Sequence, residues 1–403
     1  MKIKIYPSVA NGKATAPPSK SIAHRALICG ALSEGSVIGN VAFSKDVTAT
    51  ADCLSALGAT LNVNGSSLNI GGLNIFDLPE NTVLDCNESG STLRFLIPLC
   101  LVSGKKTTFK GAKRLFERPL SVYEAICQEQ GILFEKGENE LTVCGKLKSG
   151  NYRLRGDISS QFISGLLFAL PLLDGVSIIE IIGNFESESY VDMTLSVLSE
   201  FGIKITRAGS RFIILGNQRY QGREFTVEGD CSNAAFLQAL NFIGGDVEIE
   251  GIPTNTLQGD RVAIDIFKAL ENRKREFDLS DCPDLAPVLF AVAAVKGGAT
   301  FKGTARLRIK ESDRGAAMSQ ELKKFGIDVE IGENYVKVGS SPLRAPNEPL
   351  FGHNDHRIVM ALSVLCTLVG GEIEGAEAVA KSYPDFFDVL KKLNIGLDVY
   401  EDR

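Results

Sequence analysis

Six stretches of the chain share one order of polar and apolar residues. Each opens with small polar residues, continues as an apolar run and ends at glycine, as in "SGSTLRFLIPLCLVSG" and "DHRIVMALSVLCTLVGG". The copies begin near residues 19, 89, 159, 232, 283 and 355, so most intervals are about 70 residues and the fourth is shorter. Such runs predict buried helices that stop at the glycine.

A second pattern alternates with the first. An amphipathic helix leads to a small-residue break and then to alternating strand-like residues, as in "DVTATADCLSALGATLNV" and "YVDMTLSVLSEFGIKITR". Its fourth copy, "GDRVAIDIFKALENRKREF", is degenerate at its end. The chain is therefore predicted to be α/β, built from six copies of a small module with two helices and several strands, the fourth copy being trimmed.

The six copies divide into two groups of three around "FTVEGDCSN", which places a domain boundary near Val227. The first strand, before "GKATAPPSK", is expected to belong with the later half. Residues 14–226 would then form one lobe, and residues 1–13 with 227–403 the other. Two crossings would join the lobes, with the active site expected in the cleft between them.

Composition narrows the function. A chain of 403 residues with 44% hydrophobic and 23% charged residues is ordinary globular protein, and its net charge of −6 argues against a general nucleic-acid binder. Nine cysteines without a CxxC motif, and no apolar signal core, suggest reduced thiols in a cytoplasm. The apolar runs are too short to span a membrane, so no membrane partner is expected.

Basic residues gather where helices are predicted to start. N-terminal helix ends bind anions, whereas a cation there is mildly unfavourable. Ser19, Ser232 and Asp313 are explained as helix N-caps, but basic residues are not. Seven of them in a net-acidic chain favour an anionic ligand: Lys20, Arg25, Arg118, Lys310, Arg314, Arg357 and Lys381.

Carboxylates lie among these cations, and a carboxylate in a cationic site can exchange a proton with a substrate hydroxyl. Asp284 follows "CP", and Glu311 lies in "IKESDR". If that stretch is helical, Lys310 and Arg314 form an unfavourable i,i+4 pair that needs a carboxylate or a bound anion. His353 and His356 are three residues apart, but no supporting ligand cluster indicates a metal. No P-loop, dinucleotide fingerprint or nucleophile elbow is present.

Eight motifs in order resemble the EPSP synthase family, the 3-phosphoshikimate 1-carboxyvinyltransferases. They are "PSKSIAHRAL", "SGSTLRF", "FERPL", "ISSQFISGLL", "CPDLAP", "IKESDR", "DHR" and "AKSYPDFF", and they cover essentially the whole chain. The resemblance implies two lobes of three βαβαββ units each. It also implies transfer of the enolpyruvyl group of phosphoenolpyruvate to the 5-hydroxyl of shikimate 3-phosphate, without cofactor or metal, by a monomer whose lobes close around both substrates.

The resemblance also implies roles for single residues. Those expected to bind shikimate 3-phosphate are Lys20, Ser21, Arg25, Ser159, Ser160, Gln161, Ser187, Asp284 and Lys310. Those expected to bind phosphoenolpyruvate are Lys20, Gly90, Arg118, Gln161, Arg314, Arg357 and Lys381. Asp284 would deprotonate the 5-hydroxyl. Glu311 and Lys20 are the two candidates for protonating the methylene carbon, with His356 in support.

Two positions depart from the family pattern, and two other functions compete. Glu88 stands where the family often has asparagine, as does Arg306 before the "IKESDR" motif, so neither is assigned to the site. An enolpyruvyl transferase acting on UDP-N-acetylglucosamine would carry a reactive cysteine beside Arg118, but Cys127 lies nine residues on. A non-catalytic phospho-ligand binding protein would not need Asp284 and Glu311 among its cations.

Overall fold

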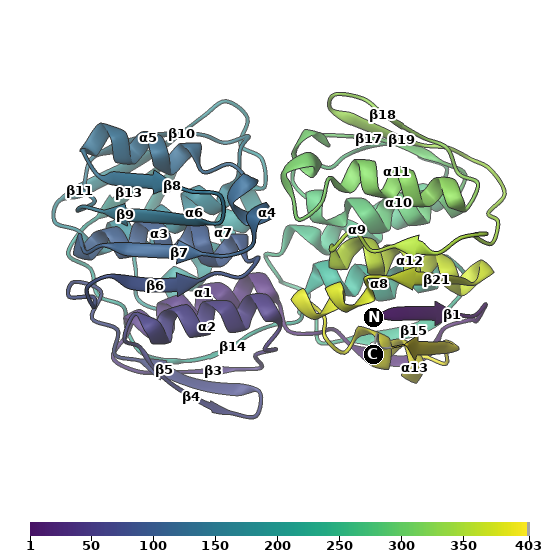
Figure 1. Ribbon diagram of the computed structural model, residues 1–403, viewed down its shortest axis with the longest axis horizontal. Helices are drawn as coiled ribbons and strands as arrows, with labels where there is room; N and C mark the ends of the chain where they lie inside the picture. The colour runs from purple at the N-terminus through teal and green to yellow at the C-terminus, as the bar shows by residue number, and fades with distance from the viewer. Residues whose placement is uncertain (401–403) are drawn as a thin grey trace. The chain divides into compact units, whose positions relative to one another are not determined.

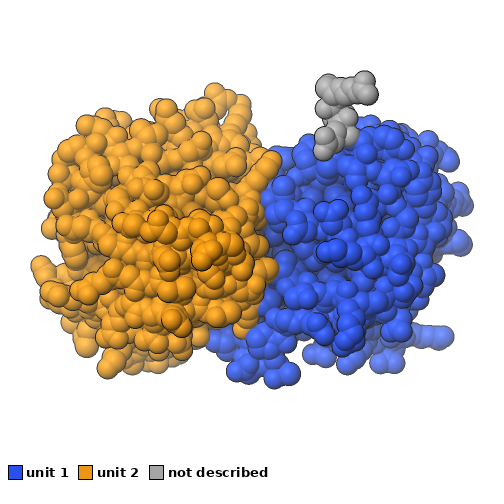
Figure 2. Space-filling model, turned by 90° about the horizontal axis from the view of Figure 1, so that it is seen from below, with its two compact units in different colours: residues 1–17, 229–403 blue, residues 18–228 orange. Residues whose placement is uncertain are grey.

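The computed structural model describes residues 1–400, which fold into two compact units. Unit 1 comprises residues 1–17 and 229–403, of which 401–403 are not described, and unit 2 comprises residues 18–228 (Figure 2). The sequence placed the two boundaries at residues 13–14 and 226–227. The first one falls later in the structure because β2 (Asn11–Thr15) pairs along its whole length with β15 (Asp246–Glu250) of unit 1.

The second repeat of unit 2 shows the module in full. Its elements are β6 (Thr82–Asp85), α3 (Gly90–Ser103), β7 (Thr107–Lys110), the short α4 (Lys113–Glu117), α5 (Ser121–Gln130), β8 (Leu133–Lys136) and β9 (Glu140–Cys144). The sheet order is β6-β7-β9-β8 (Figure 1). The first pair is parallel and the other two are antiparallel. Alternate residues of β6 and β7 are buried, so one face of the sheet covers the core.

The other two modules of unit 2 repeat this order. The third contains β10 (Asn151–Arg155), α6 (Ser160–Ala169), the 3₁₀ turn η1 (Leu170–Leu172), β11 (Val176–Ile182), α7 (Glu188–Glu200), β12 (Ile205–Ala208) and β13 (Arg211–Leu215). The first contains α1 (Lys20–Leu32), β3 (Ser36–Gly39), α2 (Lys45–Ala56), β4 (Thr60–Asn64) and β5 (Ser67–Gly71). Its missing opening strand is supplied by β14 (Glu224–Thr226), which pairs parallel with β3.

Unit 1 holds three further modules. The fourth repeat contains β2, α8 (Cys231–Phe242), β15, η2 (Gly259–Val262) and α9 (Ala263–Glu271), and its sheet has only two strands. The fifth is complete, with β16 (Glu276–Asp278), η3 (Pro283–Leu285), α10 (Ala286–Val295), β17 (Ala299–Lys302), η4 (Ala305–Ile309), α11 (Arg314–Lys324), β18 (Val329–Ile331) and β19 (Tyr335–Val338). The shortened fourth repeat agrees with the short interval in the sequence.

The sixth module is completed by the start of the chain. Its own elements are β20 (Leu350–Phe351), α12 (His356–Val369), β21 (Gly371–Glu374), η5 (Ala376–Lys381), α13 (Phe386–Lys392) and β22 (Leu397–Tyr400). Strand β1 (Lys2–Ile5) lies between β21 and β22 and is antiparallel to both. The prediction of six repeated modules in two groups of three is confirmed. Five of them have the βαβαββ order, with β14 and β1 supplied from elsewhere in the chain, whereas the fourth has only two strands, β2 and β15.

The apolar first helix of each module forms the core of its unit. In α3 and α6 nearly every residue is buried, and the two helices pack so closely that a Cβ on Gly165 would lie 2.4 Å from the Arg94 carbonyl oxygen. Pro98, inside α3, has no N–H to donate to that carbonyl one turn earlier. The Tyr123 hydroxyl donates to it instead, at 2.7 Å. This contact lets proline occupy a buried helix without leaving the carbonyl unsatisfied.

The structure also bears on the cysteines and on possible membrane-spanning helices. All nine cysteines are free thiols, eight of them buried. Within residues 1–400, no helix combines the length and apolar character needed to cross a membrane.

Candidate functional site

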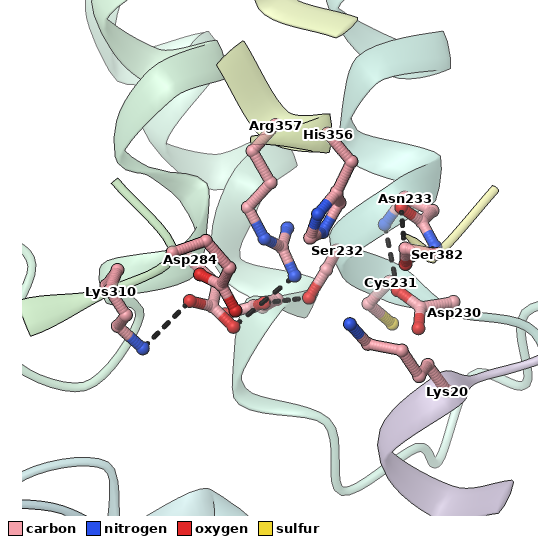
Figure 3. Close-up of polar contacts among 12 residues, drawn as sticks. Lys20, Asp230, Cys231, Ser232, Asn233, Asp284, Lys310, His356, Arg357 and Ser382 are labelled. Carbon is pink, nitrogen blue, oxygen red and sulfur yellow. Dashed lines mark hydrogen bonds and ion pairs between the residues drawn. The ribbon is translucent and has the colours of Figure 1, made fainter. Parts of the chain in front are cut away.

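Asp284 is the centre of an ion-pair network in unit 1 (Figure 3). Its Oδ1 accepts from Lys310 Nζ at 3.0 Å and from Arg314 Nη1 at 2.7 Å, and its Oδ2 lies 3.3 Å from Arg357 Nη2. Burial alone would raise the pKa of Asp284, but the positive charges of Lys310, Arg357 and Arg314 outweigh it and hold the pKa well below its usual range. Asp284 is therefore firmly ionised in this form of the protein.

Arg314 is enclosed by carboxylates. Its side chain is 1% exposed, and it donates through Nε to Asp355 at 2.9 Å and through Nη2 to Glu311 at 2.8 Å, in addition to its bond with Asp284. Burial would lower the pKa of Arg314, but these three carboxylates raise it above its ordinary value. Each nitrogen of the guanidinium thus faces a protein carboxylate, so a substrate anion would have to replace one of them.

The "IKESDR" stretch is not one helix. Residues Ala305–Ile309 form the 3₁₀ turn η4, Lys310 is extended, and α11 begins only at Arg314 after Asp313 caps it by accepting the Ala316 N–H at 3.1 Å. Lys310 and Arg314 are therefore not an i,i+4 helical pair. Both contact the same oxygen of Asp284, and this shared carboxylate offsets the repulsion that the sequence pattern suggested.

Asp355 holds the start of α12 in place. It caps the helix by accepting the Arg357 N–H at 3.0 Å, and it also accepts from Ser312 Oγ at 3.0 Å. Asp355 is completely buried. His356 follows it, 1% exposed, with Nδ1 3.9 Å from Asp355 Oδ1. Lys381, at the end of η5, donates to the Asn354 carbonyl at 2.6 Å. The start of α12 therefore contacts two of the predicted basic residues, Lys381 through Asn354 and Arg357 through Asp355.

Ser232 differs from its predicted role. Asp230, not Ser232, caps α8 by accepting the Asn233 N–H at 2.8 Å. Ser232 lies within the helix, and its hydroxyl donates to Asp260 on η2. The N-cap prediction was wrong because two polar residues, two positions apart in the chain, could each cap the helix, and the aspartate takes the cap. Burial and the nearby charge of Asp284 raise the pKa of Asp260 to about 6.

In unit 2, α1 carries three of the predicted residues. Ser19 caps the helix as expected, and Lys20 follows it with Nζ 2.8 Å from Asp46 Oδ2 on α2. Ser21 comes next, and its carbonyl accepts from Arg25 Nη1 at 2.6 Å. Arg25 also donates to Thr194 Oγ1 and to the Tyr190 carbonyl of α7.

Arg25 is 2% exposed, and burial lowers its pKa to about 10. Its guanidinium lies over the Phe95 ring, 5.2 Å from the centroid. Arg25 is thus a buried link between α1 and α7 in this form of the protein. Its predicted contact with a substrate phosphate stays a prediction.

Gly90 and Arg118 meet at the start of α3. Ser89 caps the helix, and Gly90 is its first residue. A Cβ on Gly90 would lie 2.8 Å from Arg118 Nη1 and 3.0 Å from Cζ, so any other residue here would require the guanidinium to move. The fold therefore places the Arg118 guanidinium against the N-terminus of α3, a position that normally favours an anion.

The start of α6 holds Ser159, Ser160 and Gln161. Ser159 caps the helix by accepting the Gln161 N–H at 3.3 Å. The Gln161 side chain is fixed by Arg94 Nη1, 2.6 Å from Oε1, and by Ser91 Oγ, 3.0 Å from Nε2. These contacts hold the amide in one orientation.

Ser187 opens α7 with a left-handed backbone, φ 54°, and is 3% exposed. A non-glycine residue in this conformation is uncommon and is a mark of functional or constrained turns.

The structure brings the unit 1 residues Asp284, Lys310, Glu311, Arg314 and Arg357 into one network. The predicted residues of unit 2 instead lie at or near four helix starts, those of α1, α3, α6 and α7. Sequence reasoning missed two carboxylates that contact the cations, Asp46 beside Lys20 and Asp355 beside Arg314, and it also missed Asp260 and Arg94. A signal existed for two of them, because Asp355 and Arg94 lie inside the quoted motifs "DHR" and "SGSTLRF".

Comparison with known proteins identifies the family. The family model for EPSP synthase (3-phosphoshikimate 1-carboxyvinyltransferase) matches residues 6–390. The chain is 44% identical to 3-phosphoshikimate 1-carboxyvinyltransferase of Clostridium kluyveri, over 98% of each chain. It is 42% identical to that of Clostridium acetobutylicum, over 99% of this chain and 98% of the other. Two structures of EPSP synthase from Acinetobacter baumannii, at 23% and 22% identity, each align with a TM-score of 0.80, covering 99% and 100% of this chain and all of theirs. The chain belongs to the 3-phosphoshikimate 1-carboxyvinyltransferase (EPSP synthase) family.

Proposed function

We propose that the residue sets of the two units together carry out the family's reaction. In it, the enolpyruvyl group of phosphoenolpyruvate passes to the 5-hydroxyl of shikimate 3-phosphate, giving 5-enolpyruvylshikimate 3-phosphate and phosphate. Both substrates are anions, and seven basic residues at or near helix starts match that charge. Arginine suits this task because its planar fork pairs with carboxylate and phosphate through two parallel hydrogen bonds.

The observation that carries the proposal is the triple contact of Asp284 with Lys310, Arg314 and Arg357. In this form those cations keep the carboxylate ionised and weakly basic. When substrate phosphate and carboxylate groups attract the same cations, the stabilisation of ionised Asp284 weakens and its basicity rises. A carboxylate next to the 5-hydroxyl would then accept its proton at the moment of attack.

The second proton transfer needs an acid. Protonation of the methylene carbon of phosphoenolpyruvate creates an oxocarbenium-like centre, which the 5-hydroxyl oxygen attacks. The resulting tetrahedral intermediate loses phosphate from that centre and a proton from the new methyl group, which restores the double bond. Glu311 and Lys20 are the candidates for giving and recovering this proton, with His356 in support.

Charge balance favours Glu311 as the acid. The network holds three cations, Lys310, Arg314 and Arg357, and the carboxylates Asp284, Glu311 and Asp355. It is therefore neutral without ligand. An added substrate anion gives it an excess of negative charge, which favours protonation of the carboxylate nearest the anion. Asp355 is completely buried and Asp284 is the proposed base, so Glu311, whose side chain is 18% exposed, is the carboxylate left for this role.

The reaction is tested by measuring phosphate release from phosphoenolpyruvate. Release is expected only when shikimate 3-phosphate is present, and a chelator is expected to leave the rate unchanged. Release that required UDP-N-acetylglucosamine would indicate the other enolpyruvyl transferase. Binding of both substrates with no release would indicate the non-catalytic binding protein.

The role of Asp284 is tested by Asp284→Ala, with Asp281→Ala as a nearby control. Loss of the base is expected to lower kcat by about 10²–10⁴ while both substrates still bind. Turnover close to that of the wild type would contradict the role. We also propose a cytoplasmic monomer: the nine free thiols support a reducing compartment, and sedimentation velocity with and without substrates tests the oligomeric state.

A further inference from the structure

Four buried side chains of unit 2 form a hydrogen-bonded chain that no step of the reaction uses. His24 Nδ1 on α1 lies 2.7 Å from Thr50 Oγ1 on α2, and Thr50 Oγ1 lies 2.6 Å from Thr92 Oγ1 on α3. The Thr92 hydroxyl donates to Ser89 Oγ at 2.7 Å. All four residues are at most 1% exposed. This hydrogen-bonded chain of side chains thus ends at Ser89, the residue that caps α3.

This hydrogen-bonded chain begins one helical turn further along α1 and α2 than the Lys20–Asp46 ion pair of the candidate site. Lys20 pairs with Asp46, and four residues later on both helices His24 pairs with Thr50. The two contacts are therefore parallel rungs between α1 and α2, since residues four apart share one face of a helix. The outer rung contains Lys20. The inner rung continues to Ser89, next to Gly90.

The hydroxyl protons run in one direction. Thr92 gives its only hydroxyl proton to Ser89, so toward Thr50 it can only accept. Thr50 then gives its proton to Thr92 and must accept from His24. His24 is therefore the donor, with its proton on Nδ1.

His24 is also neutral. Among residues 1–400 its buried Nε2 has no hydrogen-bond partner, which suits an unprotonated nitrogen better than an N–H carrying part of a positive charge. Burial and the nearby positive charges of Lys20 and Arg25 lower the pKa of His24 well below its ordinary value, in agreement with the geometry.

We propose that His24 is a positioning residue: as the Nδ1–H tautomer it fixes the start of α1, with Lys20, relative to the start of α3, with Gly90 and Arg118. The inference rests on the proposed function, because it assumes that those residues bind phosphoenolpyruvate. Unlike Lys20, His24 touches no substrate. It acts through the two threonines and the helix cap, and a small misplacement of binding groups is enough to slow a reaction substantially.

Two substitutions distinguish the loss of the His24 Nδ1–H donor from a change in side-chain volume. His24→Leu removes the donor and leaves Thr50 without its partner. In His24→Asn, the side-chain amide presents an N–H close to the position of Nδ1. We expect kcat/KM for phosphoenolpyruvate to fall roughly tenfold or more in His24→Leu and to recover to within about threefold in His24→Asn.

The matched control is Ser33→Ala at the other end of α1. Ser33 is 2% exposed and makes two buried hydrogen bonds, to the Gly30 carbonyl and to Ser36 Oγ. Ser33→Ala should lower the melting temperature without changing kcat/KM for phosphoenolpyruvate. Equal kinetic losses in His24→Leu and Ser33→Ala would overturn the proposal, as would His24→Asn failing to improve on His24→Leu.

Two measurements keep the proposal testable if His24→Leu does not fold. The wild-type protein, labelled with ¹⁵N-histidine, contains only three histidines, and His24 is expected as a neutral ring with protonated Nδ1 from pH 6 to 8. An Nε2–H tautomer or a charged ring would overturn the proposal. In addition, Thr50→Val should reduce kcat/KM as much as His24→Leu, and combining the two should add little.

Failure of the proposed function would look different. If the wild type released no phosphate with shikimate 3-phosphate, the assigned reaction would be wrong while the tautomer measurement still reported on the chain. If the wild type is active and the His24 variants keep its kcat/KM, the reaction stands and the positioning role is wrong.

Discussion

Replacing Asp355 by asparagine tests whether the unit 1 network is held together by its buried carboxylate. Asp355 is fully buried, and it contacts Arg314 through two nitrogens, at 2.9 and 3.5 Å, as well as the hydroxyl of Ser312. It also caps α12. Asp355→Asn keeps the size and the capping oxygen but removes the negative charge, so the change isolates the ion pair.

The magnitude follows from what remains around Arg314. Removing one partner of a buried ion pair costs about 3–5 kcal/mol, because the other charge stays buried. Asparagine still caps a helix about as well as aspartate. Asp284 and Glu311 continue to neutralise the guanidinium, so the lower end, about 3 kcal/mol, is expected.

Thermal unfolding followed by circular dichroism measures this effect. For a folding unit of about 150–250 residues, 3 kcal/mol corresponds to a fall in Tm of roughly 6–12 °C. High salt should change the difference little, since a buried pair is poorly screened. Asp313→Asn is the control, because Asp313 caps the neighbouring α11 by the same geometry and either residue type serves as a cap.

The comparison of these two variants decides the question. If Asp355→Asn melts within about 1–2 °C of Asp313→Asn, the charge of Asp355 does not anchor Arg314, and the account of the network is wrong. If Asp355→Asn melts much lower and its loss disappears at high salt, the pair is solvated rather than buried, which would contradict the burial on which the estimate depends.

Three other substitutions test separate features. Gly90→Ala places a Cβ 2.8 Å from Arg118 Nη1; we expect KM for phosphoenolpyruvate to rise about tenfold with a smaller change in kcat, and an unchanged KM would show that the guanidinium can move at no cost. Asp260 has a pKa raised to about 6, so its ionisation opposes folding fully above pH 6 and not at all below about pH 4. Asp260→Asn should therefore stabilise the protein by up to about 3 kcal/mol at pH 7.5, with a gain in Tm that shrinks as the pH falls through this window, and a gain independent of pH would contradict the assignment. Tyr123→Phe removes the hydroxyl that donates to the Arg94 carbonyl, and urea unfolding should show a loss of about 1–3 kcal/mol; no loss would mean that another donor replaces it.

The repeated architecture could be predicted because each module is specified by a short, local sequence pattern. Each module presents its polar start, apolar helix and glycine within a short stretch, and the same order recurs along the chain. The exchanged strands are harder to predict. Strand β14 completes the first module from residues 224–226, and nothing in its three residues indicates that its partner is β3. Pairing over long sequence distance depends on the whole fold, not on local pattern.

The cations of the site were predictable and their partners were not. Lys20 and Lys310 stand out in the sequence because a basic residue at a helix start is locally unfavourable. The carboxylates that oppose them, Asp46 and Asp284, each lie 26 residues away in the chain. An aspartate at the start of a helix is unremarkable by itself. Its role therefore becomes visible only when the fold places it against a cation.

The "IKESDR" stretch shows how such a partner changes an interpretation. As a helix, its lysine and arginine would repel each other across one turn. In the structure Asp313 delays the start of α11 until Arg314, and Lys310 stays extended, so that the two cations approach Asp284 Oδ1 from different directions at 3.0 and 2.7 Å. Two cations that share one carboxylate oxygen are only partly neutralised by it. A substrate anion is therefore expected to bind most readily to Lys310, which is 22% exposed, rather than to Arg314, which is 1% exposed and bound by two further carboxylates.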